Sequence, residues 1–518
     1  MSRESVSDIL FTMRDKGVKI WADNGRLRYQ ASKGALTSQD IETLRTMREE
    51  ILTALRHSTS PRTGPHLMPR LPASHVPLTF SQQYMWSFWD LVKRPSMRMV
   101  AAAVRLRGRL EVEYLRQSFE RLFHRHESLR TRIVLVEGVP QQHIDDPDGY
   151  HLEVIELTGS SQEKREIEAR RLASEIVHEP FYLDRGPLFA ARLIKVNHLD
   201  HVLVVAADHT ISDAASIGIV WRDVFSMYTQ FVRGQPCCLP EMPVQFADYA
   251  VWQRKTHPLW TETHGPYWER HLTGATRVRL FAGEKVACAA GVKWATVPIR
   301  FGEILSKGLL EVSRRQRTSM VMSVLTVFVS LILRWCNTTD LVFPFTTMGR
   351  SWPEVHNTIG FFGTPLLLRV EMSDGESFLG LLARVTQEYV TACEHDDSYR
   401  TAAQIHPPFA LNPPFNWVPK EFNMSPDGSS QALEACTISL YELDIIPRAD
   451  FECDSEPRVD FSDTPDGIVG IIGYWADRAT QDSVKRFGKN LLFFAEKLVQ
   501  EPMTRINEIE LLKDGQFG

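Results

Sequence analysis

The chain has 518 residues, of which 43% are hydrophobic and 24% charged, and its formal net charge is −5 at pH 7. This balance is ordinary for a globular protein, and it argues against a general nucleic-acid or membrane-surface binder. The length is enough for about two to four domains. The seven cysteines show no CxxC pair and no regular framework, so reduced thiols in a cytoplasmic protein are expected, and no metal site.

Residues 1–57 are predicted to form a small unit of their own. The stretch SVSDILFTMRDKG has apolar residues at helical spacing. In VKIWADNGRLRYQA, apolar and polar residues alternate on both sides of Asp-Asn-Gly, which predicts a β-hairpin over residues 18–31. The stretch TSQDIETLRTMREEILTALR predicts an amphipathic helix capped by Thr37 or Ser38. Because so small a unit has a marginal core, we expect it to bind a partner.

Residues 58–75 are rich in proline, serine and glycine, so a partly extended linker is expected there. Beyond them, helical and strand patterns alternate in two similar halves, which we take as an N-lobe over 76–240 and a C-lobe over 241–518. This alternation predicts an α/β protein of two lobes, and a cleft between the lobes would be the default site.

Two stretches bear on targeting and membrane insertion. The N-terminus, MSRESVSDIL, lacks the apolar centre of a signal peptide. Residues 320–335, MVMSVLTVFVSLILRW, are too few for a membrane span and include Ser, Thr and Arg, so a buried helix is predicted. We therefore expect a cytoplasmic protein that binds neither membrane nor nucleic acid.

The stretch HVLVVAADHTISDAASIGIV places a histidine at a junction of elements. HVLVVAA predicts a buried strand, and the following helix would be capped by Ser212 or Asp213. His209 then lies where a strand ends, a place where catalytic groups are often presented, and it can accept a proton near neutral pH. The alternative is a core histidine beside a capping aspartate, and this stretch alone leaves that alternative open.

Further motifs occur along the chain. They are PLTFSQQYMW at 77–86, RHESLRT at 125–131, DHTISDA at 208–214, QFADYAVWQ at 245–253, IGFFGTPLLLR at 359–369 and, more loosely, HPPF at 406–409. In this order and at this spacing they resemble the condensation domains of nonribosomal peptide synthetases, within the chloramphenicol-acetyltransferase-like superfamily. The resemblance covers about residues 75–515, and DHTISDA falls where that family has HHxxxDG. Residues 1–57 resemble the β-hairpin docking domains of some synthetase subunits.

The resemblance implies a fold and a set of partners. Two chloramphenicol-acetyltransferase-like lobes are expected in a V shape with a central tunnel, plus a small α+β docking domain. Carrier proteins would bring thioester-bound groups to the mouths of the tunnel on their phosphopantetheine arms, so no cofactor of the chain's own is expected. The docking domain would bind the C-terminal tail of a carrier-bearing subunit through Lys19, Arg26 and Arg28, and the enzyme is expected to be a monomer.

The resemblance also implies roles for residues of the DHTISDA motif. His209 matches the family's second histidine, which faces the tunnel and accepts or redirects one proton. Whether it is a full base or mainly a positioning group is left open. Asp213 would point away from the substrate and support the site through an ion pair with Arg350.

Three departures bear on the function. The family's first histidine is Asp208 here, and its glycine is Ala214. The same stretch fits the DxxxxDxxS pattern of heterocyclization domains through Asp208, Asp213 and Ser216, so Asp208, Ala214 and Ser216 are candidates for lining the active site. Heterocyclization, or a carrier-binding adaptor without chemistry, is therefore the alternative to condensation.

The sequence shows no adenylation motif, no carrier domain and no thioesterase GxSxG. The expectation is a free-standing acyltransferase of a nonribosomal peptide or hybrid polyketide assembly line, acting in secondary metabolism such as antibiotic biosynthesis. It would move an acyl chain from a carrier thioester to an amine or hydroxyl, forming an amide or ester. The nucleophile would be carrier-bound or a small molecule, and the latter would make the step a chain release.

Overall fold

The computed structural model describes most of the chain. The described residues are 18–23, 26–30, 36–48, 66–73, 75–92, 99–159, 161–275, 277–281, 294–395, 413–418, 431–433, 436–441, 443, 456–464 and 467–512. The helix expected within residues 1–17 and the HPPF stretch lie outside them. The chain forms two compact units, Met1–His66 with Glu311–Ser319, and Leu67–Leu310 with Met320–Gly518.

The first unit contains the predicted hairpin. Strand β1 (Lys19–Asp23) pairs antiparallel with β2 (Arg26–Gln30), so the turn falls at the Asn-Gly pair, as predicted. Helix α2 (Ser38–Thr46) follows. Its start is capped reciprocally, because the Asp40 carboxylate accepts from the Thr37 N–H at 2.8 Å and the Asp40 N–H donates to the Thr37 hydroxyl at 3.2 Å.

The second unit contains one sheet of six strands from the first half of the chain and a short segment of the second half. Its order is β14-β15-β4-β9-β8-β7, in which β7 and β8 are parallel and the other neighbours antiparallel. The strands are β4 (Met99–Gly108), β7 (Glu153–Glu156), β8 (Phe189–Asn197), β9 (Asp200–Asp208), β14 (Gln431–Leu433) and β15 (Cys436–Leu440). The two halves of the chain therefore share this sheet.

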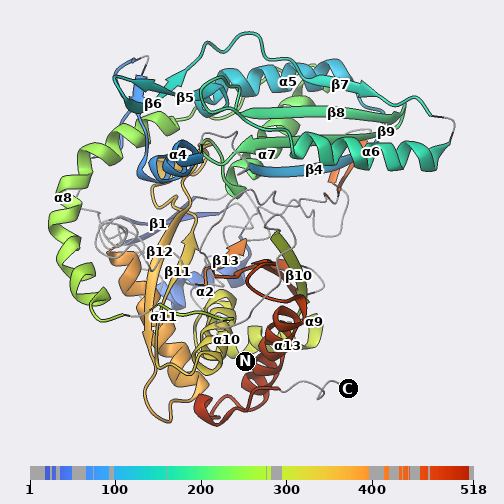
Figure 1. Ribbon diagram of the computed structural model, residues 1–518. Helices are drawn as coiled ribbons and strands as arrows, with labels where there is room; N and C mark the ends of the chain where they lie inside the picture. The colour runs from blue at the N-terminus through green and yellow to red at the C-terminus, as the bar shows by residue number, and fades with distance from the viewer. Residues whose placement is uncertain are drawn as a thin grey trace. The chain divides into compact units, whose positions relative to one another are not determined.

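Helices cover both faces of this sheet (Figure 1). They are α5 (Val112–Arg125) and α7 (Ala214–Val232) on one face and α6 (Gln162–Val177) on the other. Every residue of β9 is buried, as the continuous apolar run predicts. Its side chains alternate between the two cores, and Leu203 and Val205 pack toward α5 and α7 while Val202 and Val204 pack toward α6.

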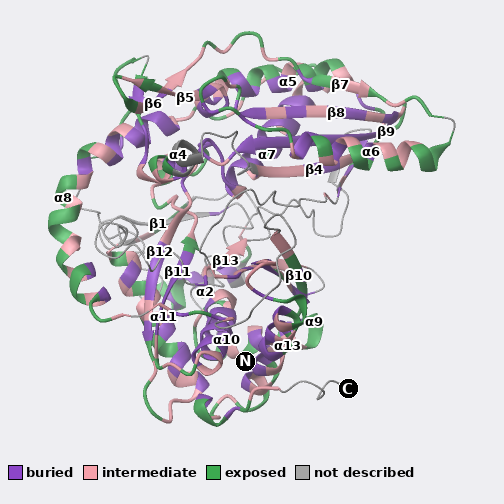
Figure 2. Cartoon of the chain, viewed as in Figure 1, coloured by how far each residue is buried: buried purple, intermediate pink, exposed green. Residues whose placement is uncertain are grey.

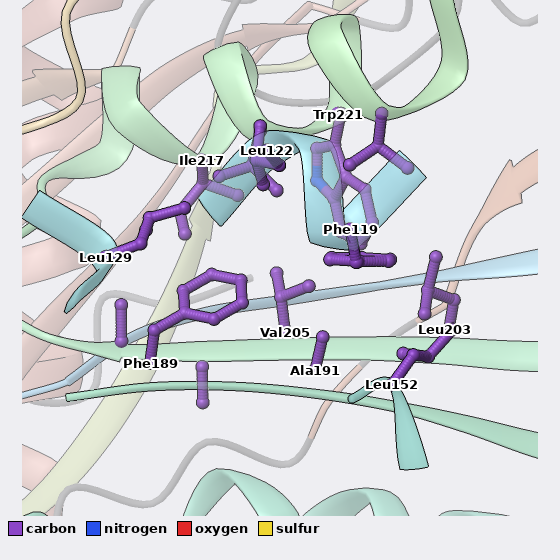
Figure 3. Close-up of a cluster of buried hydrophobic side chains, with 14 of the residues drawn as sticks. Phe119, Leu122, Leu129, Leu152, Phe189, Ala191, Leu203, Val205, Ile217 and Trp221 are labelled. Atoms are coloured by element: carbon purple, nitrogen blue, oxygen red, sulfur yellow. The ribbon is translucent and has the colours of Figure 1, made fainter. Parts of the chain in front are cut away.

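The core between β9 and the helix pair is dense with large side chains (Figure 3). Phe119 and Leu122 from α5 meet Ile217 and Trp221 from α7 over Phe189 of the sheet. All five are almost fully buried. This packing fixes α7 against β9, and therefore fixes the loop that joins them.

The second sheet has the order β10-β17-β16-β13-β11-β12. Its strands are β10 (Trp294–Arg300), β11 (Asp340–Thr347), β12 (Thr364–Glu371), β13 (Phe415–Val418), β16 (Arg458–Thr464) and β17 (Gly467–Trp475). The helices that follow this half are α9 (Gly302–Arg315), α10 (Met320–Trp335), α11 (Phe378–Glu394) and α13 (Gln481–Gln500). Figure 2 shows α10 largely in the colour of buried residues.

The sequence predicted one continuous helix through residues 307–336, and this is wrong. The chain breaks between α9 and α10, where Arg317 has a φ of 54° that a helix interior cannot accommodate. Among the described residues no single helix is long and apolar enough to cross a bilayer, and only α9 and α10 together, bent by 107°, meet that test.

The remaining elements of the second unit flank the site. A small sheet has the order β3-β6-β5, formed by β3 (His75–Pro77), β5 (Thr131–Val136) and β6 (Val139–Ile144). Helix α4 (Phe80–Val92) follows β3, and the long helix α8 (Phe246–Leu272) follows α7. Short 3-10 turns lie at Glu127–Arg130, Pro353–Val355 and Ile506–Glu508.

Candidate active site

The loop between β9 and α7 carries the DHTISD residues. Strand β9 ends at Asp208, and α7 begins at Ala214 with Asp213 as its N-cap, because the Asp213 carboxylate accepts from the Ser216 N–H at 2.9 Å. Of the two predicted caps, Ser212 and Asp213, the structure selects Asp213. His209 is thus held between a fully buried strand and a capped helix.

The His209 ring is oriented by the loop itself. Its Nδ1 lies 2.9 Å from the Ser212 carbonyl oxygen, and since that oxygen can only accept, Nδ1 carries the hydrogen. Among the residues that the structure describes, none forms a hydrogen bond with Nε2. In the neutral ring Nε2 therefore offers its lone pair, which is the arrangement that a proton acceptor needs.

The surroundings of His209 favour the neutral ring. Burial lowers its pKa below the usual 6.5, and the negative charges of Asp213 and Asp208 only partly oppose this. The Phe361 ring packs against the imidazole at a centroid distance of 4.5 Å and excludes water from that side. At neutral pH the imidazole is unprotonated and able to accept a proton.

Asp208, in place of the family's first histidine, organises the loop. Its carboxylate accepts from the Thr210 N–H at 2.8 Å and from the Thr210 hydroxyl at 2.6 Å. The side chain is buried, with 1% of the residue exposed. It therefore acts on the loop from within the protein and fixes the residue that follows His209.

The ion pair of Asp213 and Arg350 is present and bidentate. The Arg350 guanidinium donates to the two carboxylate oxygens at 2.7 and 2.9 Å, and both side chains are less than 10% exposed. Asp213 also accepts from the Phe362 N–H at 3.1 Å. One carboxylate thus joins the start of α7 to the loop after β11 and to the residues before β12.

Charge balance keeps Asp213 ionised. Burial by itself would raise the pKa of Asp213, but the charge and hydrogen bonds of Arg350, with those of Ser216, outweigh burial and lower the pKa below 3.8. The Arg350 guanidinium also lies over the Phe362 ring, 4.5 Å from its centroid. A buried charge of each sign is therefore compensated.

Ser216 belongs to the same network. Its hydroxyl lies 2.8 Å from the Asp213 carboxylate and 2.9 Å from the Gly360 carbonyl, and it accepts from Arg350 at 3.0 Å. Ser216 is fully buried, and Ala214 beside it is partly buried. The serine of the DxxxxDxxS pattern is thus engaged with the ion pair, which gives it a structural part independent of heterocyclization.

Two glycines allow the loops to approach. Gly349 has a φ of 62°, and a Cβ there would stand 1.7 Å from the Phe362 carbonyl oxygen. At Gly360 a Cβ would stand 2.3 Å from the Phe246 ring. Any side chain at either position would push apart the segments that Asp213 and Arg350 join.

The second motif, RHESLRT, reaches the same segments from another side. The Ser128 hydroxyl donates to the Ile359 carbonyl at 2.6 Å. His126 and Arg125 contact the carboxylate of Asp223 on α7 at 3.0 and 3.2 Å. This motif therefore supports α7 and the residues before β12, and its own histidine is buried away from solvent, with 1% exposed.

The first and fourth motifs are joined to each other. Gln253 accepts from the Phe80 N–H at 3.0 Å, and Arg254 donates to the Leu78 carbonyl at 2.7 Å. Arg70, in the segment expected to be a linker, pairs with Asp248 at 2.7 Å and with Glu127 at 3.0 Å. This end of the linker is therefore anchored in the second unit.

Sequence reasoning did not single out Arg70, Asp223 or Gln82. A charged residue in a proline-rich segment and an aspartate in the middle of an apolar helix were the available signals for the first two. Gln82 lies within the first motif, but nothing in that motif indicates that its side chain contacts the DHTISD loop. No sequence pattern predicts which loop such a residue will contact.

The docking residues lie on the hairpin of the first unit. In the register of β1 and β2, Lys19 pairs with Gln30 and Arg28 with Trp21. By strand alternation Lys19, Arg26 and Arg28 occupy positions on one face of the hairpin. Arg28 is exposed. The binding role of these three residues remains a prediction.

The described residues include no group of three or more His, Cys, Asp or Glu side chains that could hold a metal ion. The site offers an imidazole, a buried ion pair and well-satisfied loops. Its chemical capacity is therefore proton transfer at His209.

Comparison with known families identifies the class of protein. Residues 73–399 match the Condensation domain family, and residues 6–57 match the TubC N-terminal docking domain. The chain belongs to the condensation-domain family of nonribosomal peptide synthetases and carries a docking domain before it.

Particular relatives agree with this. Phosphinothricin tripeptide synthetase PhsC of Streptomyces viridochromogenes is 32% identical over 348 residues, which are 66% of this chain and 32% of that protein. A protein of the linear gramicidin synthase of Brevibacillus parabrevis is 33% identical over 342 residues, which are 65% of this chain and 7% of that protein. The chain thus matches only a minor part of the length of these curated relatives.

Solved structures share the fold. The X-domain from teicoplanin biosynthesis has a TM-score of 0.73 and 23% identity over 86% of this chain and 100% of the X-domain. The first condensation domain of the calcium-dependent antibiotic synthetase has a TM-score of 0.68 and 18% identity over 85% of this chain and 99% of that domain. The chain therefore has the chloramphenicol-acetyltransferase-like fold of condensation domains.

The ion pair generates a stability prediction. Asp213→Ala should lower the free energy of unfolding by about 3–5 kcal/mol, because Arg350 is left as a buried charge without its partner. Arg350→Met should cost a similar amount, and the double variant should cost less than the two single variants together. Urea unfolding at pH 7 would measure all three.

The exposed ion pair of Arg171 and Glu168 on α6 supplies the matched control. Arg171→Ala should leave the unfolding midpoint nearly unchanged, because solvent screens that pair. An Asp213→Ala variant with the wild-type midpoint would contradict a supporting role for the ion pair.

Proposed function

We propose that the chain transfers an acyl group from the phosphopantetheine thioester of a carrier protein to an amine or hydroxyl, with His209 as the proton acceptor. The observation that carries this proposal is the state of His209. Its Nδ1–H is bound to the Ser212 carbonyl, its Nε2 lone pair is available, and its pKa is lowered by burial. The family membership supplies the class of reaction, which is the formation of a peptide bond in synthetase assembly lines.

The residues define a sequence of proton movements. The nucleophile attacks the thioester carbon, a C–N or C–O bond forms, and Nε2 of His209 accepts the proton that the nucleophile loses. The resulting imidazolium is stabilised by the negative charges of Asp213 and Asp208. When the C–S bond breaks, the same proton passes to the departing phosphopantetheine thiolate. The thioester is already activated, so alignment and this one proton are the main requirements.

The heterocyclization alternative has less support. It rests on Asp208 and Ser216, and both side chains already have structural hydrogen bonds within the loop and the ion-pair network. The adaptor alternative is favoured by one observation. The X-domain from teicoplanin biosynthesis, whose fold is similar, has been solved as a complex with OxyB. A chain that only recruits partners would bind a loaded carrier and leave its thioester intact.

We infer that the hairpin of the docking domain binds an acidic, flexible C-terminal tail of a carrier-bearing subunit. A strand at the edge of so small a sheet can add a further strand, with main-chain hydrogen bonds for affinity and charge for selectivity. The match to the TubC N-terminal docking domain supports a partner of this kind. Lys19, Arg26 and Arg28 supply the positive charge.

His209→Ala should lower the rate of acyl transfer by about 10²–10⁴-fold, because the proton acceptor is removed while the loop contacts remain. The measurement is the intact mass of an acyl-loaded carrier after incubation with an amine or hydroxyl nucleophile. His178→Ala, at the end of α6, is the matched control and should transfer at the wild-type rate. A His209→Ala rate within tenfold of wild type would refute the assignment.

The pH dependence follows from the lowered pKa of His209. The reaction needs the neutral ring, and a lowered pKa extends the neutral form to more acidic pH. The value of kcat/KM should therefore stay level from pH 8 down to about the unperturbed pKa of 6.5 and fall only below it. A rate profile that is already half-lost above pH 7 would mean that His209 is charged at neutral pH.

Deleting residues 1–57 should slow transfer from a carrier with an acidic tail but leave transfer from a small acyl thioester unchanged, because the docking domain acts on the carrier and not on the chemistry. The effect of the deletion should shrink as salt is raised, since exposed charges are screened. Equal loss with both substrates would show a folding defect, and no loss with either would exclude a docking role.

A further inference from the structure

Gln82 is a buried polar side chain with all its contacts directed at backbone or at another buried glutamine. Its residue is 0% exposed. Its Oε1 accepts from the Thr79 N–H at 2.9 Å, which fixes the orientation of the amide. Its Nε2 therefore carries the hydrogens, and it donates to the Thr210 carbonyl at 3.0 Å and to the Gln142 Oε1 at 3.3 Å.

The Thr210 contact lies one residue beyond His209. On the other side of the Thr210 peptide, the Thr210 N–H and hydroxyl donate to Asp208. Thr210 is thus held at its N–H by β9 and at its carbonyl by α4. Gln142 in turn donates to the Pro77 carbonyl at 2.9 Å, so the clamp is braced against β3.

We propose that Gln82 is a positioning residue for His209. It holds the Thr210 carbonyl and thereby fixes the backbone from which the imidazole projects. The inference rests on the proposed function, in which the alignment of Nε2 with the nucleophile determines the rate. A small misplacement of a catalytic group is costly, and about 1 Å can lower a rate by 10²-fold.

Gln82 has a second, ordinary task. The Gln82 N–H donates to the Thr79 hydroxyl at 3.1 Å, so the two residues form a capping box at the start of α4. Glutamate serves this box as well as glutamine, because the box needs only an acceptor. Gln82→Glu therefore keeps the cap and removes the N–H that binds Thr210. This separates positioning of the loop from capping of the helix.

The two variants Gln82→Glu and Gln82→Met are compared by steady-state kinetics on the full chain with an acyl-loaded carrier. Gln82→Met has no donor at any pH, so kcat should fall about 10- to 100-fold throughout, with KM within about twofold of wild type. In Gln82→Glu a protonated carboxyl can still donate to the Thr210 carbonyl, whereas the ionised form repels it. The ratio of its kcat to that of wild type should therefore fall as pH rises.

The neighbouring Gln83 provides the matched control on the same helix. It is exposed, and its Oε1 accepts from Arg254 at 2.6 Å. Gln83→Glu keeps this acceptor and should show the wild-type kcat at every pH. If Gln82→Met and Gln82→Glu behave like Gln83→Glu, the positioning role is wrong.

A readout without turnover keeps the test independent of the proposed function. Histidine labelled with ¹³C at Cε1 reports the titration of His209, whose signal is the one missing in His209→Ala. Gln82→Met should shift the midpoint and the chemical shift of this signal, and Gln83→Glu should leave both in place. Wild-type protein that transfers no acyl group would refute the proposed function, while this comparison would still decide the role of Gln82.

Folding is checked by near-ultraviolet circular dichroism, and kcat is expressed per folded molecule. A loss of kcat that disappears after this correction would overturn the proposal. Failure of both Gln82 variants to fold would overturn it too, because Gln82 would then be a residue that the fold itself requires.

Discussion

The bidentate ion pair between Asp213 and Arg350 is the constraint on which the site depends. It is buried, and it joins a helix start from one half of the chain to loops from the other half. The loops can meet there only because Gly349 and Gly360 have no side chain in the space between them. Ser216 fills the remaining hydrogen-bonding positions. Buried charges are costly unless each is paired and hydrogen-bonded, and here both are.

The state of His209 is a consequence of this frame. Because Asp213 is committed to Arg350, it does not bind the imidazole, and the ring takes its hydrogen bond from the Ser212 carbonyl instead. Burial then lowers the pKa of His209 against the pull of two nearby carboxylates. The result is a neutral base in a protein interior, held by backbone and not by a charged partner.

Sequence alone predicted the parts that depend on local pattern. The hairpin turn, the buried strand before His209 and the helix after it are confirmed, because alternation, an apolar run and a capping aspartate each act over a few residues. The Asp213–Arg350 pair came from resemblance, since no local rule joins residues so far apart. The break at Arg317 and the contact of Gln82 with Thr210 were missed. Both depend on how distant segments pack, which periodicity does not encode.

The central claim is that His209 is a neutral imidazole with its hydrogen on Nδ1 and a lone pair on Nε2. The most direct test is the ¹⁵N chemical shifts of the His209 ring at pH 7, assigned by comparison with His209→Ala. The account predicts a protonated Nδ1 and an unprotonated Nε2, and this pattern should persist at pH 6.5. A ring with hydrogen on both nitrogens at pH 7, or on Nε2 alone, would contradict it.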